Sequence, residues 1–233
     1  VGSTMTLMPA FGEHLVPARV RLILGLAFTA VVLPAALPQL APGGQSALGI
    51  AALAGEVAIG LMLGLMLRLF VFCLQIAGTI AAQATSLSQL FGGTSGEPQP
   101  AVGELLTIAG LAIAVHLGLP VKIVELFLGS YQALPPGRMP DMELLHDWGL
   151  AGFVQAFSLA FSIAAPFVIA GLIYNVALGA INRAMPQLMV AFVGAPALTL
   201  GGLVLLAVAL PSGLVLWQQA FDHFLANPFV VAR

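Results

Sequence analysis

Long apolar runs, in which Glu56 is the one charged residue, make up most of the chain and are separated by short polar intervals. They begin after Arg21, and their approximate bounds are 22–40, 47–67, 69–90, 105–121, 148–182 and 184–221. A helix needs about 20 apolar residues to cross the hydrocarbon core of a bilayer, and most runs reach that length. None shows the sustained apolar–polar alternation of a transmembrane strand. The pattern predicts an all-α membrane protein built from helical hairpins whose helices are broken by Gly and Pro.

Two intervals interrupt this pattern most clearly. Residues 91–100 read FGGTSGEPQP, and this density of Gly and Pro predicts a loop. Residues 132–149 contain the most polar stretch of the chain and predict an exposed connector. We therefore expect an N-terminal helical part at 1–131, the connector at 132–149, and a C-terminal helical hairpin at 150–233.

The C-terminal hairpin contains one charged position between its two long apolar runs, Arg183, which predicts the tip of the hairpin. The connector carries one Arg against three acidic residues, whereas the turn at Arg183 is purely basic. By the positive-inside rule, Arg183 is expected on the cytoplasmic side. Prolines are expected to kink or end helices in this part of the chain, and they stand at positions 166, 186, 196 and 211.

Composition narrows the possible functions. Hydrophobic residues make up 60% and charged residues 7%, with 7 basic and 9 acidic side chains and a net charge of −2. Seven scattered cations cannot form a nucleic-acid-binding face, so we expect no nucleic-acid partner. A single Cys excludes a disulfide within the chain and a thiolate metal cluster. The sequence has no phosphate-binding glycine loop, nucleophile elbow or paired carboxylates beside a His, so we expect no catalysis, cofactor or metal.

The abundance of helix-breaking residues indicates an environment other than plain lipid. The chain has 26 Gly and 16 Pro. Broken helices at membrane depth are tolerated where they are buried in protein or line a water-filled cavity. We therefore expect protein partners, a cavity, or both.

A polar stripe runs along the third apolar segment. Its members, spaced by four, four and three residues, are Gln75, Thr79, Gln83 and Ser86. This spacing places them on one face of a helix. In lipid the amides would lack partners, so the stripe must face water or a polar helix. Two interpretations remain open, namely hydrogen bonding between helices and the lining of a conduit.

The second apolar segment holds two further features. Gly60 and Gly64 have the spacing of a close helix–helix contact. Glu56 lies among apolar residues, where a charge costs about 3 kcal/mol. It is expected to pair with a basic group, to stay protonated, or to lie near an interface. His116 is expected to form a local hydrogen bond rather than to bind a metal.

Several strings, taken together and in order, resemble those of a known family. They are MPAFGE at 8–13, VPARVR at 16–21, SYQALPPG at 130–137, NRAMPQL at 182–188 and VGAP at 193–196. In this order they resemble motifs of the FliR family of flagellar type III export-gate proteins, which has homologues in virulence injectisomes. The resemblance covers essentially the whole chain.

The resemblance implies a setting and partners. It implies one subunit of a helical hetero-oligomer with P-type and Q-type gate components and the B-type switch component. The assembly would lie in the bacterial inner membrane, within the flagellar basal body, and unfolded flagellar subunits would pass through it. Residues 1–131 resemble the P component, and residues 150–233 resemble the Q component.

The resemblance also implies residue roles. A loop after the third helix acts as a plug in this family, and the matching positions here are Leu87, Leu90, Phe91, Gly92 and Gly93. Apolar side chains on a flexible hinge can block a pore by dewetting. The alternative is that they simply pack against neighbouring helices.

The family's cytoplasmic turn corresponds to Arg183, Pro186 and Gln187. The sequence thus predicts a non-catalytic, pore-forming subunit of the export gate. The alternative is a small proton-coupled secondary transporter in which Glu56 carries the proton.

Overall fold

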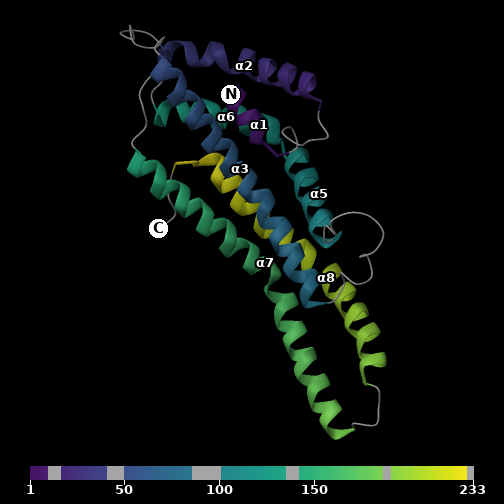
Figure 1. Cartoon of the computed structure of the whole chain (residues 1–233). Coiled ribbons are helices and arrows are strands. Elements are labelled where there is room, and N and C mark those ends of the chain that lie inside the picture. The colour runs from purple at the N-terminus through teal and green to yellow at the C-terminus, as the bar shows by residue number, and fades with distance from the viewer. Residues whose placement is uncertain (10–16, 41–49, 86–100, 135–141, 186–189, 230–233) are drawn as a thin grey trace. The chain divides into compact units, whose positions relative to one another are not determined.

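The computed structural model describes residues 1–9, 17–40, 50–85, 101–134, 142–185 and 190–229, and they are almost entirely helical (Figure 1). The helices are α1 (Gly2–Leu7), α2 (Ala18–Leu40), α3 (Ile50–Ala84), α5 (Ala101–His116), α6 (Leu119–Ala133), α7 (Met142–Ala184) and α8 (Val190–Ala226). No strand occurs within these ranges. The all-α prediction is confirmed.

Among the residues that the structure describes, four helices are long and apolar enough to cross a membrane, namely α2, α3, α7 and α8. The pair α5 and α6 passes the same test when taken together, although the two helices are bent by 76° at the break between them. The described part of the chain therefore has four candidate spans, or five if the bent pair counts as one. This agrees with the predicted membrane protein with broken helices.

The second and third apolar segments form a single helix, contrary to the expected division at Arg68. α3 runs through this position and has 35 residues. Arg is a good helix former, and one half-buried charge gives the backbone no reason to leave the helical conformation. In this part of the chain, a change of hydropathy therefore does not mark a helix end.

The fourth apolar segment, expected to continue to residue 121, is broken instead. Gly118 adopts a left-handed conformation with φ of 83°, and α6 begins directly after it. Pro120 lies in the first turn of α6, where its missing N–H is harmless. The same Pro could not continue α5, because its ring would clash with the preceding turn.

The prolines of the C-terminal hairpin do not end its helices. Pro166 lies inside α7, and Pro196 and Pro211 lie inside α8. Membrane helices tolerate such interruptions because neighbouring groups satisfy the freed carbonyls. None of these three residues ends a helix, so a kink is the alternative that stays a prediction for them, and Pro186 lies outside the described residues. Arg183 stands in the last turn of α7, so the hairpin turn follows it as predicted.

The boundary between the two predicted parts of the chain stays a prediction. Within residues 132–149, α6 ends at Ala133 and α7 begins at Met142. The first turns of α7 bury Leu145 and Trp148, which are 6% and 7% exposed.

The helices form two compact units. The first contains Val1–Val71, Leu111–Ala156 and Ala220–Arg233, and the second contains Phe72–Gly110 and Phe157–Gln219. In the first unit α2 packs on α1 and α6. Side chains of α3, α6 and the end of α8 form its core, including Leu63, Leu67, Leu119, Ile123, Leu126 and Phe221.

The short helix α1 fits against the glycines of α3. A Cβ atom on Gly60 would collide with the Ser3 side chain, and one on Gly64 would lie 2.8 Å from the carbonyl oxygen of Thr4. The predicted close helix contact at Gly60 and Gly64 is therefore confirmed, with α1 as the neighbour.

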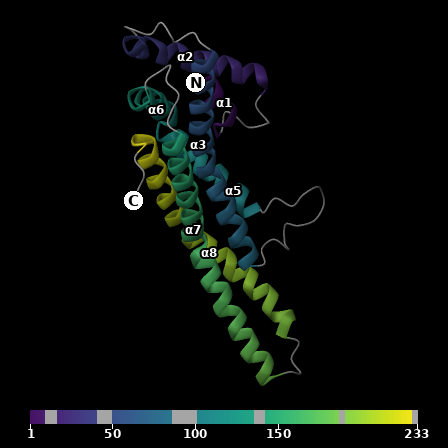
Figure 2. The same cartoon turned by 60° about the vertical axis from the view of Figure 1, so that its left-hand side comes forward.

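In the second unit, the later part of α7 and the earlier part of α8 run side by side, as Figures 1 and 2 both show. The remainder of α3 and most of α5 complete this unit. Its core consists of buried residues from all four helices, including Leu74, Ala77, Leu106, Ala164, Phe167 and Trp217.

Candidate functional site at the end of helix α3

The predicted polar stripe lies on α3 and becomes more exposed toward the end of the helix. Gln75 and Thr79 are half-buried, whereas Gln83 is exposed. The Thr79 hydroxyl donates to the carbonyl oxygen of Gln75 at 2.8 Å, so its own helix satisfies it. Neither Gln amide bonds to another residue that the structure describes. Ser86 lies outside the described residues, and both interpretations of the stripe stay predictions.

Helices α3 and α5 approach each other closely at two glycines beside this stripe. A Cβ atom on Gly78 would collide with the backbone of Gly103. The buried Thr107 hydroxyl donates to the carbonyl oxygen of Gly103 at 2.8 Å, so the polar group at this contact is satisfied. The contact holds the start of α5 against the part of α3 that precedes residues 86–100.

The last residues of α3 lie between α7 and α8. A Cβ atom on Gly171 of α7 would lie 2.6 Å from the carbonyl oxygen of Ala84, and one on Gly202 of α8 would lie 2.7 Å from the Cβ atom of Thr85. Thr85 is 2% exposed, and its hydroxyl donates to the carbonyl oxygen of Ala81 at 2.7 Å. Gly171 and Gly202 thus form a glycine notch that receives the end of α3.

The predicted plug follows this notch directly in the sequence. Its residues, Leu87, Leu90, Phe91, Gly92 and Gly93, lie outside the described residues, so the plug role stays a prediction. What the structure describes is the anchor before it, which sequence reasoning missed. The only signal for it in the sequence was the presence of glycines, at 171 and at 201–202, in otherwise apolar runs.

The predicted cytoplasmic turn is described only at Arg183. This residue is exposed in the last turn of α7, where a cation interacts favourably with the helix dipole. Pro186 and Gln187 lie outside the described residues. Arg183 is the only Asp, Glu, Lys or Arg between Gly149 and Phe221.

In the first unit, Glu56 lines a small cavity together with polar groups of α1 and α6. The cavity has a volume of about 20 Å³, and Thr4, Ser130 and Tyr131 contribute to its wall. The Thr4 hydroxyl oxygen is buried and bonds to no described group. A space of this size holds about one water molecule. Glu56 therefore has a small polar environment instead of plain lipid.

The C-terminal segment returns to earlier helices of the first unit. Lys122 of α6 forms an ion pair with Asp222 of α8, with 2.7 Å between Nζ and Oδ1. Phe70 of α3 packs against Phe221 and Phe224, with both ring centroids at 5.3 Å. Sequence analysis missed the ion pair because its partners are 100 residues apart.

A second link joins the start of α7 to the residues that follow α8. The Trp148 indole donates from Nε1 to the carbonyl oxygen of Pro228 at 2.5 Å, and its ring stacks on Phe229.

Within the described ranges, no three His, Cys, Asp or Glu residues gather as metal ligands. The exposed His116 ends α5.

Curated relatives match the chain over most of its length. It is 30% identical over 228 residues to "Flagellar biosynthetic protein FliR" of Caulobacter vibrioides, covering 97% of this chain and 91% of the relative. The protein of the same name from Aquifex aeolicus is 30% identical over 93% of this chain and 84% of its own length. "Secretion system apparatus protein SsaT" of Salmonella typhimurium is 27% identical over 73% of this chain and 67% of the relative.

The sequence profile of one family covers nearly the whole chain. It is described as bacterial export proteins, family 1, and it matches residues 1–224. This range includes every string on which the FliR resemblance rests. The chain therefore belongs to the bacterial export proteins of family 1, as a FliR-type component of a type III export gate.

Proposed function

We propose that this chain is a non-catalytic, pore-forming subunit of the bacterial flagellar type III export gate, and that unfolded flagellar subunits cross the inner membrane through the assembled gate. Family membership over residues 1–224 supports this function. The names of the Caulobacter and Aquifex relatives favour the flagellar system over the injectisome.

The observation that carries the pore-forming role is the seating of α3 in the glycine notch. Ala84 and Thr85 are held by contacts that leave no room for a side chain on Gly171 or Gly202. The residues that follow, 87–93, are the predicted plug. A rigid anchor before a glycine-rich segment would keep apolar side chains near one point of a pore, where they exclude water.

The partners in this proposal are P-type and Q-type gate subunits and the B-type switch component. Exposed apolar side chains of α2 support an assembly, because surfaces of this kind require lipid or protein cover. They include Leu22, Ile23 and Leu26, each more than 60% exposed. In the proposal, residues 1–131 take the place of a P-type subunit and residues 150–233 that of a Q-type subunit, in the inner membrane of the flagellar basal body.

The transporter alternative receives no specific support. It requires a binding site near Glu56 that holds a solute. The cavity that Glu56 lines has a volume of about 20 Å³, whereas small-molecule sites measure roughly 300–1,000 Å³.

Export itself tests the function. Removing the gene from its own bacterium should abolish the appearance of flagellar subunits in the medium, and the intact chain supplied from a plasmid should restore it. The tagged chain should also co-purify with P-type and Q-type subunits. Normal export without the gene, or purification of the chain without partners, would contradict the proposal.

A second experiment tests the plug separately. Deleting residues 91–97 should make the membrane permeable to ions and small solutes, because the apolar block is lost. The double substitution Leu90→Ala with Phe91→Ala should leak to a smaller degree. Leu150→Ala with Val154→Ala on α7, at positions 56% and 61% exposed, is the matched control and should not leak. Unchanged ion permeability in the deletion variant would reject the plug but leave the export role standing.

A further inference from the structure

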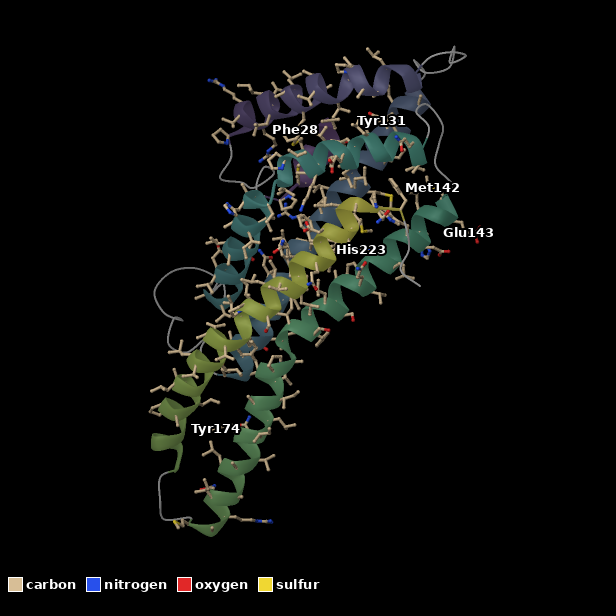
Figure 3. The ribbon with its side chains drawn as sticks, turned by 180° about the vertical axis from the view of Figure 1, so that it is seen from behind. Phe28, Tyr131, Met142, Glu143, Tyr174 and His223 are labelled. Atoms are coloured by element: carbon tan, nitrogen blue, oxygen red, sulfur yellow. The ribbon has the colours of Figure 1, made fainter. Side chains whose placement is uncertain are left out.

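Helices α7 and α8 border an open apolar cleft next to the end of α3. Its volume is about 600 Å³, and Thr85 lies in its wall beside Gly202. The walls include Ile173 and Ala177 of α7 and Leu205 and Val208 of α8. Figure 3 shows Tyr174, another lining residue, between the two helices. The cleft lies wholly within the second unit.

The surroundings of the cleft are suited to hydrocarbon. Both α7 and α8 are candidate membrane spans. Large apolar side chains beside the cleft face outward from both helices, among them Leu172 and Val176 of α7 and Leu200 of α8, each at least 64% exposed. The cleft is therefore continuous with a surface that lipid tails would wet.

The length of the cleft matches one leaflet of a bilayer. Along α8 its lining extends from Ala197 to Val208. Eleven residues at 1.5 Å each give about 16 Å of helix, and half of a hydrocarbon core is about 15 Å.

A single cation lies where the polar end of such a lipid would be. Arg183 follows Ala177 by six residues, or about 9 Å along α7. It is exposed, and the sequence places no other charged residue between Gly149 and Phe221. A guanidinium group binds phosphate oxygens through paired hydrogen bonds, and a long Arg side chain can reach toward an interface.

We propose that this cleft binds one acyl chain of an anionic phospholipid whose phosphate contacts Arg183. The acyl chain lies along the cleft from Ala197 to Val208 and passes Thr85, so the lipid contacts the glycine notch. The proposal rests on the membrane location of α7 and α8 and does not depend on the export role.

Lipid retention tests the cleft. The full chain, purified in its native complex, is stripped with detergent and reconstituted with vesicles of phosphatidylglycerol or phosphatidylcholine of identical acyl chains. Bound phospholipid is then counted by native mass spectrometry. Ala177→Phe fills the cleft and should lower retention at least about fivefold, the effect of losing roughly 1 kcal/mol. Val176→Phe, on the outer face, is the matched control and should retain lipid like the unmodified chain.

The role of the Arg183 charge is tested by measuring whether the protein retains phosphatidylglycerol in preference to phosphatidylcholine. Arg183→Gln should lower the preference for phosphatidylglycerol about fivefold, the contribution of one basic residue near an anionic surface. Arg183→Lys should keep most of it. Equal retention by Ala177→Phe and the unmodified chain, or an unchanged preference in Arg183→Gln, would overturn the proposal.

A crosslinking experiment covers the case in which Ala177→Phe fails to fold. Benzoylphenylalanine at position 174 is activated by light in intact membranes, and the adduct is identified by mass. A phospholipid adduct supports the proposal. A protein adduct, or no adduct, overturns it. Neither outcome bears on whether the gene is required for export, so the two proposals fail independently.

Discussion

At Gly171 the backbone of α7 comes so close to the end of α3 that the missing side chain is what permits the contact. The nearest group is the carbonyl oxygen of Ala84, which belongs to a backbone and cannot rotate away. Gly179, two turns later in the same helix, has nothing within 4 Å of the corresponding position. A side chain would therefore collide with α3 at position 171, whereas position 179 has room for one.

This contrast gives a prediction at the residue scale. Gly171→Ala should destabilise the protein by about 1–3 kcal/mol, because the added methyl group overpacks a rigid contact. Gly179→Ala should stabilise it by up to about 0.5–1 kcal/mol, since Ala loses less entropy in a helix. Thermal unfolding of the detergent-solubilised full chain measures both. Equal effects of the two substitutions would show that Gly171 does not form a close contact.

At the scale of elements, two separate residues cause the break between α5 and α6. Gly118 supplies the left-handed residue, and Pro120 prevents α5 from continuing. No atom lies within 4 Å of a Cβ atom placed on Gly118. The cost of a side chain there is therefore conformational and does not come from a collision.

The corresponding prediction separates conformation from packing. Gly118→Ala should cost about 1–2 kcal/mol, the penalty for a left-handed residue with a Cβ atom. Gly118→Asn should cost less, because Asn tolerates this conformation. Gly129→Ala in the middle of α6, also in open space, should not destabilise. Unfolding curves for the three variants test this order, and a loss for Asn as large as that for Ala would contradict it.

At the scale of the whole molecule, the sequence predicts those features that depend on residues close together in the chain, such as membrane helices. Long uncharged runs predicted membrane helices, and Gly60 and Gly64 predicted a close contact. The same reasoning divided the apolar sequence into two segments at Arg68. In the structure α3 continues through this residue, because one charged side chain lowers the local hydropathy but Arg still favours a helical backbone. The family strings identified the relationship to FliR, but they left the plug and the polar stripe as predictions.

Contacts between distant parts of the chain could not be predicted. The glycine notch joins Gly171 and Gly202 to Ala84 and Thr85, and a sequence of many glycines does not say which two face the same helix end. The first unit is built from three separate stretches of chain, and the last begins at Ala220. Lys122 and Asp222 are 100 residues apart, so no helical spacing in the sequence indicates that they form an ion pair.

The ion pair between Lys122 and Asp222 should help to hold the last stretch of chain in the first unit. Its side chains are 30% and 38% exposed, between the surface and buried cases, so Lys122→Met or Asp222→Asn should each cost about 1–2 kcal/mol. The double reversal Lys122→Asp with Asp222→Lys should recover part of this loss, and the recovery should shrink in 1 M salt because the charges are screened.

Asp147→Asn is the matched control, since its pair with His146 is 74% exposed on both sides, and it should change stability by less than about 0.5 kcal/mol. Thermal unfolding of the unmodified chain, these four variants and the single reversals Lys122→Asp and Asp222→Lys decides the matter, and a double reversal no more stable than the sum of the two single reversals predicts would show that the two charges do not interact.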